Sequence, residues 1–79
     1  MEYYIIIFKN TFDAMAAEEK LKSMNIEHKV MPTPTLTILS CGLCIKIDNE
    51  TIINDIIQKE LVQYKSILKK ENGEFKNIK

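Results

Sequence analysis

Tyr3-Tyr4-Ile5-Ile6-Ile7-Phe8 is the stretch of sequence that decides the fold, because every residue in it is apolar or aromatic. A continuous run of this kind, rich in isoleucine, predicts a strand that is buried on both faces. Such a strand belongs in the middle of a sheet. We therefore expect residues 3–8 to form the central strand, with later strands on either side.

The segments after this strand alternate between helical and strand patterns. Asn10 or Thr11 is a candidate N-cap for a helix over residues 11–24, and Asn25 suits the left-handed position that ends a helix. A second helix is expected after Asp48 or Asn49. Three further strands are predicted from apolar alternation and β-branched content, over residues 26–31, 43–47 and 64–68. Residues 33–42 are predicted to form a loop.

The resulting order, β-α-β-β-α-β, is that of the ferredoxin-like fold. We expect an α+β two-layer sandwich, with an antiparallel sheet in the strand order 4-1-3-2 and both helices on one face. Residues 1–69 would form this single domain. Residues 70–79 are polar and are expected to be a frayed tail or a short hairpin at Asn72-Gly73.

The face of the sheet without helices is expected to expose alternate residues of the 3–8 strand. An exposed apolar patch of this kind usually marks an interface. The sequence therefore predicts a homodimer, or another contact, through the open sheet face.

Composition narrows the classes of partner and the compartment. Eleven basic residues balance eleven acidic ones and arginine is absent, which argues against a nucleic-acid partner. No apolar run approaches the ~20 residues that span a bilayer, and Met1-Glu2-Tyr3-Tyr4 lacks the basic region of a signal peptide. We expect a cytoplasmic protein with reduced thiols. Neither a cofactor nor a set of acid–base residues is indicated, so a carrier or binding protein is favoured over an enzyme.

Ser40-Cys41-Gly42-Leu43-Cys44 contains both cysteines of the chain. The predicted topology places Cys41 and Gly42 at the start of the third strand. There they would adjoin the segment Lys9-Asn10-Thr11, which joins the first strand to the first helix. A helix N-terminus stabilises a thiolate and lowers its pKa. Lys9 would add a full positive charge, and Gly42 would allow close approach to the backbone.

Several interpretations of the cysteine pair stay open. A redox pair of the thioredoxin type starts a helix, whereas this pair leads into a strand. A closed zinc site needs four ligands, and the chain offers two cysteines and one histidine. Soft-metal (Cu or Zn) binding by Cys41 and Cys44, a carrier thiol at Cys41, and a non-catalytic interaction module with structural cysteines remain. Cys44, in the middle of a strand, is expected to pack in the interior.

The whole pattern resembles the DUF3343 family of selenium or sulfur carrier-like proteins. The similarity extends over residues 3 to about 69, and its most specific part is the Pro-Thr-Pro segment followed by the Ser-Cys-Gly-Leu segment. The residues that carry it are Tyr4-Ile5-Ile6-Ile7-Phe8, Thr11-x-Asp13-Ala14-Met15, Glu18, Leu21, Pro32-Thr33-Pro34 and Ser40-Cys41-Gly42-Leu43.

The resemblance implies that sulfur or selenium is carried on a cysteine, with Cys41 at the matching position and transfer proteins as partners. Two positions depart from the family pattern. Thr35 stands where a basic residue is frequent, and Cys44 stands where a small residue without a thiol is usual. Cys44 is therefore outside the shared pattern, although it could still resolve a persulfide or disulfide formed on Cys41.

Overall fold

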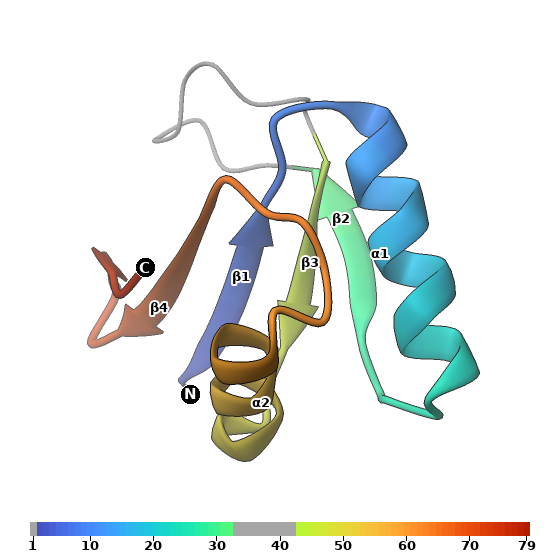
Figure 1. Cartoon of the computed structure of the whole chain (residues 1–79). Helices are drawn as coiled ribbons and strands as arrows, with labels where there is room; N and C mark the ends of the chain where they lie inside the picture. Colours follow the sequence, from blue (N-terminus) through green and yellow to red (C-terminus); the bar gives the residue numbers. More distant parts are fainter. Residues whose placement is uncertain (1, 33–42) are drawn as a thin grey trace.

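The computed structural model describes residues 2–32 and 43–79, and Figure 1 shows the arrangement of the elements. In this part of the chain, five strands form one sheet and two helices pack against it. The elements are β1 (Tyr3–Ile7), α1 (Thr11–Ser23), β2 (Lys29–Pro32), β3 (Leu43–Ile47), α2 (Glu50–Lys59), β4 (Ser66–Glu71) and β5 (Glu74–Asn77). The predicted α+β class is confirmed. The predicted loop over residues 33–42 lies outside the described residues.

The sheet is antiparallel throughout and has the order β2-β3-β1-β4-β5. β1 lies in the centre, as its continuous apolar run predicts, and Ile6 pairs with Ile45 on one side and Ile67 on the other. Read from β4 to β2, these strands have the predicted order 4-1-3-2, but the predicted sheet of only four strands is wrong, because a fifth strand extends it beyond β4.

A two-residue turn creates the fifth strand. Asn72 and Gly73 both have positive φ, 52° and 79°, which is the backbone that a type I′ hairpin turn requires. The sequence predicts that β4 ends at Leu68, but the strand continues to Glu71. β5 pairs with it in the antiparallel direction. The sequence left residues 70–79 as either a frayed tail or a short hairpin at Asn72-Gly73, and the structure has the hairpin.

Side-chain caps and a left-handed residue set the limits of α1. The Asn10 side chain accepts a hydrogen bond from the backbone N–H of Asp13 at 2.7 Å, as a good N-cap residue does. At the other end, Asn25 has a φ of 58°, and the N–H of Ile26 donates to the carbonyl of Leu21 at 2.9 Å. This is the Schellman arrangement. After this helix end, β2 begins at Lys29, three residues later than the predicted start at residue 26.

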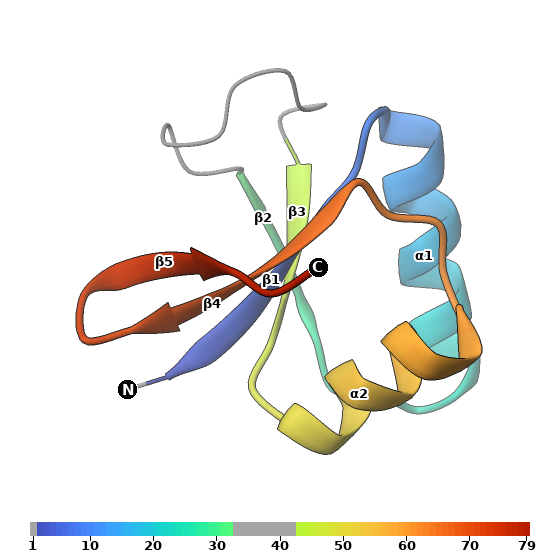
Figure 2. The same ribbon diagram turned by 60° about the vertical axis from the view of Figure 1, so that its left-hand side comes forward.

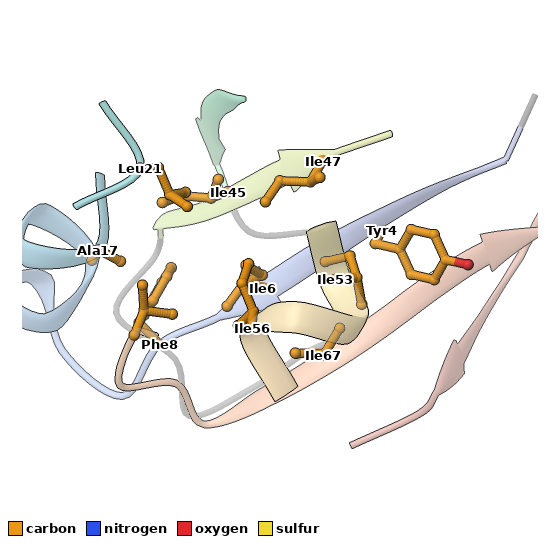
Figure 3. Close-up of a cluster of buried hydrophobic side chains, with 12 residues drawn as sticks. Tyr4, Ile6, Phe8, Ala17, Leu21, Ile45, Ile47, Ile53, Ile56 and Ile67 are labelled. Atoms are coloured by element: carbon orange, nitrogen blue, oxygen red, sulfur yellow. The ribbon is translucent and has the colours of Figure 1, made fainter. Parts of the chain in front are cut away.

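Both helices lie on one side of the sheet, which Figure 2 shows clearly. The core between the layers draws on alternate residues of β1 and β3 and on one face of each helix (Figure 3). Its largest fully buried side chains are Ile6, Phe8, Leu21, Ile45, Ile47, Ile53, Ile56 and Ile67. The predicted placement of both helices on one face is thus confirmed.

The face without helices holds a second, smaller cluster. Ile5 and Ile7 on this face are 0% and 1% exposed, and Tyr3, Met31 and Phe75 pack against their cluster. The expectation that alternate residues of β1 form an exposed apolar patch is therefore wrong. Phe75 belongs to β5, the second strand of the hairpin at Asn72-Gly73, and it packs against this cluster.

Candidate functional site

The start of β3 lies beside the end of β1, as the sequence predicts for the region around the cysteines. In the antiparallel register, Ile7 pairs with Cys44, so Leu43 at the start of β3 is level with the residues that follow β1. Cys41 and Gly42 lie outside the described residues, and the described chain resumes at Leu43. The structure therefore positions one side of the predicted site.

The residues that lead into α1 form that described side. Lys9, Asn10 and Thr11 are exposed. Because the Asn10 side chain accepts from the N–H of Asp13, one of the amide groups at the helix start is already satisfied. The amides of Thr11 and Phe12 have no acceptor among the described residues. These two N–H groups give the end of the helix its partial positive charge.

The charges near the start of α1 oppose one another. Lys9 is an exposed cation just before the helix, while Asp13 is an anion in its first turn. Asp13 favours the helix by interacting with its positive end. The same carboxylate offsets part of the attraction that Lys9 and the helix would offer to a thiolate. Electrostatic stabilisation at this end of the molecule is therefore modest.

Two apolar side chains in the same region are exposed, which the sequence reading missed. Phe12 is 79% exposed and Met15 is 63% exposed. Three residues apart on α1, they lie on neighbouring turns of the same helix face. They lie outside the buried stripe of Ala14, Ala17 and Leu21. Their positions relative to this stripe could have predicted their exposure.

Cys44 occupies the interior of the face without helices. Its side chain is 0% exposed, and its Sγ donates to the carbonyl of Pro32 at 3.7 Å. It packs with Ile5, Ile7 and Leu68. The expectation that Cys44 packs in the interior is confirmed. To act as a resolving thiol it would need a local opening of β3, since buried structural cysteines are inert.

The candidate ligands in the described part of the chain do not gather. No group of three or more His, Cys, Asp and Glu side chains that could hold a metal occurs among the described residues. The ring of His28 is largely buried, with 10% of its side chain exposed. Its Nδ1 lies 2.8 Å from the carbonyl oxygen of Ile26, so the proton on Nδ1 donates to that oxygen. This contact orients the His28 ring, and its Nε2 lies 3.8 Å from Oε2 of Glu18.

A hollow of the described surface lies at the other end of β3. It has a volume of about 550 Å³ and is lined by Glu27, Asp48, Asn49 and Glu50. Asp48, Asn49 and Glu50 follow β3 in the chain, and Glu27 precedes β2. The cysteine segment, in contrast, leads into the start of β3. The hollow is acidic and forms no part of the predicted thiol site.

A buried tyrosine beside this hollow has a shifted pKa. The hydroxyl of Tyr4 donates to Oε2 of Glu50 at 3.2 Å. Burial, and next the negative charge of Glu50, raise the pKa of Tyr4 above its usual 10.0. The folded protein thus keeps this proton to a higher pH than the unfolded chain does.

We expect this pair to make stability fall in alkaline solution. The raised pKa stabilises the fold fully below pH 10.0, and that stabilisation is lost as the pH rises through the higher pKa of the folded state. Urea unfolding of the wild type and of Tyr4→Phe, on both sides of this pH, measures the effect. The wild type should lose more stability on the alkaline side than Tyr4→Phe, whereas Tyr64→Phe should behave as the wild type does. Equal losses in the wild type and Tyr4→Phe would exclude this role of the pair.

Neither helix in the described part of the chain has the length and apolar character needed to cross a bilayer. The chain was also compared with known proteins. A protein-family model described as "Putative Se/S carrier protein-like" matches residues 3–78. No curated protein and no solved structure matches the chain.

Proposed function

Because the chain belongs to the Se/S carrier protein-like family, we propose that it carries sulfur or selenium on Cys41. The observation that carries this proposal is the family match over residues 3–78, which includes the segment Ser40-Cys41-Gly42-Leu43. The position of Leu43 beside the end of β1, from which the chain leads into α1, supports it. One accessible thiolate is all that such a carrier needs, and it requires no set of acid–base residues.

The proposed loading step is a transfer between sulfur atoms. The Cys41 thiolate attacks the terminal sulfur of a donor persulfide, R–S–SH, and a new S–S bond forms. The S–S bond of the donor breaks, and its electron pair leaves with the donor sulfur as a thiolate. Cys41 then holds a persulfide. A selenium atom would be accepted in the same way, as Cys–S–SeH.

The neighbouring residues would assist this step. The exposed Lys9 would attract an anionic donor group, while Asn10 and Thr11 at the start of α1 would direct N–H groups toward the thiolate. Gly42 would let the donor approach the backbone closely. Cys44 is fully buried, so we assign it to packing and expect it to resolve the persulfide only where β3 opens.

Intact mass spectrometry of the protein purified without reductant tests this proposal. The expected result is a species heavier by ~32 Da for sulfur or ~79 Da for selenium, which dithiothreitol removes. Peptide mapping should place the addition on the fragment that contains Cys41. Protein that takes up no such mass, even after incubation with a persulfide donor, would rule the carrier role out.

The partners of this proposed cycle are donor and acceptor proteins in the cytoplasm, where thiols stay reduced. The homodimer predicted from the sequence is a separate proposal. The sequence predicts the dimer from an exposed apolar patch on the open face of the sheet, but Ile5 and Ile7 on this face are buried. The exposed pair Phe12 and Met15 is the better candidate for a contact. Sedimentation velocity at micromolar concentration distinguishes a monomer from a dimer.

A further inference from the structure

The face without helices carries a row of lysines and aromatic rings along one end of the sheet. Lys29 pairs with Lys46 across β2 and β3, and Nζ of Lys46 lies 4.6 Å from the centre of the Tyr3 ring. Tyr3 pairs with Lys70, whose Nζ lies 4.8 Å from the centre of the Phe75 ring. We call these five residues the lysine–aromatic row.

This row is positively charged, although the chain as a whole is neutral. None of the described strand positions that share its face is acidic, because Glu71 and Glu74 alternate onto the opposite face of β4 and β5. Two carboxylates come near. Glu27, two residues before β2, lines a hollow together with Lys29 and Lys46. Asp48, just after β3, lines the same hollow, lies 4.0 Å from Nζ of Lys46 and is 64% exposed. An exposed pair at that distance is weak. The prediction against a nucleic-acid partner rests on the net charge of the whole chain. The net charge does not show that this one face is positive.

We propose that the lysine–aromatic row binds single-stranded nucleic acid. The rings of Tyr3 and Phe75 lie 6.4 Å apart in an edge-to-face arrangement and are half-buried, so each keeps an exposed part. Aromatic side chains on an open sheet are the surface on which single-stranded bases stack, and nearby cations contact the phosphates.

The lysines do not block this site, although two of them lie over the rings. An exposed cation–π contact is weaker than the stacking of a base on the same ring. Lys46 and Lys70 can therefore move from the rings to the phosphate groups when a base stacks. Lys29, Lys46 and Lys70 would then contact three phosphates.

Charge and shape favour this occupant over two others. A second copy of the chain, related by a two-fold axis, would bring three lysines against three lysines. An acidic protein segment would satisfy the lysines but would make no specific use of the ring faces. A strand of nucleotides matches both the cations and the rings.

Fluorescence anisotropy with a labelled oligouridylate of about twelve nucleotides, at low salt, tests the proposal. Wild-type protein is expected to bind, and log K should fall with log[salt] with a slope of about −2, for three phosphate contacts. Phe75→Leu and Tyr3→Leu should each weaken binding by roughly 5- to 100-fold. Leucine keeps an apolar side chain against the buried cluster of this face, and thermal melts confirm that each variant is folded.

Charge variants give a second readout that does not depend on the rings. Lys46→Gln and Lys70→Gln should each reduce the salt slope by about 0.7. The matched control Lys59→Gln, at the end of α2 on the side of the helices, should change neither slope nor affinity. The proposal is overturned if the wild type does not bind, or if ring variants bind normally while polyglutamate competes as well as oligouridylate does. The second result would assign the row to an acidic protein.

Discussion

Replacing Ile6 by alanine is expected to lower the free energy of unfolding by about 3 kcal/mol. Ile6 is 0% exposed in the middle of the central strand and contacts the core that joins both layers. Its neighbours across the sheet, Ile45 and Ile67, are equally buried and belong to regular strands. They cannot move far enough to fill the cavity that the shorter side chain leaves.

A loss of this size is large for a small domain. Folded proteins of 79 residues have total stabilities on the order of 4–12 kcal/mol. The midpoint of thermal unfolding should therefore fall by roughly 15 °C, which differential scanning calorimetry measures. Ile78→Ala is the matched control, because it is the same substitution at a side chain that is 41% exposed. Similar losses in both variants would show that Ile6 is not the centre of the core.

Replacing Cys41 by alanine is expected to remove all of the sulfur or selenium that the protein carries. The proposed role places the whole chemical function on this one thiol, since a persulfide can form only on a sulfur atom. The measurement is the mass of the protein after incubation with a persulfide donor. The wild type should gain ~32 Da and Cys41→Ala should gain none.

Cys44→Ala provides the control for this experiment, because it removes the other thiol of the chain. It should still load on Cys41, and it should cost about 1 kcal/mol of stability for the buried atoms removed. Lys9→Gln should slow loading by at most about five-fold, the effect of one exposed charge. A normal load on Cys41→Ala combined with no load on Cys44→Ala would transfer the carrier role to Cys44 and refute the assignment.

The central strand shows what the sequence could predict. Ile5 and Ile6 point to opposite faces, and both are fully buried, so a run without alternation specifies a central position. The sequence narrowed each N-cap to two neighbouring residues, of which Asn10 and Asn49 are the caps, and it predicted the stop at Asn25. Each acts through a local hydrogen bond or backbone angle, and local interactions leave clear signals in the sequence.

The far edge of the sheet was harder to predict. Glu74–Asn77 has one apolar residue, Phe75, and too little pattern to indicate a strand without knowledge of β4. The sequence left the hairpin open beside a frayed tail. Phe75 packs against the second cluster, so without a definite β5 the burial of this face was not predicted. The distribution of charged side chains between the two faces of the sheet could not be predicted from the sequence, because it depends on the register of five strands.

For the site, the sequence predicted the meeting of β1, α1 and β3 correctly, because topology alone requires it. The burial of Cys44 also followed from its place within a strand. The exposure of Phe12 and Met15 was missed, since helix spacing marks the buried stripe more clearly than the residues outside it.

The central place of β1 also affects how the protein is made. A ribosome synthesises Ile67 about sixty residues after Ile6, with which it pairs. Until β4 emerges, one edge of the most apolar strand has no partner, and pairings across so long a separation form slowly. While these sixty residues are being made, β1 must avoid pairing with other chains, because aggregation competes with folding at this stage.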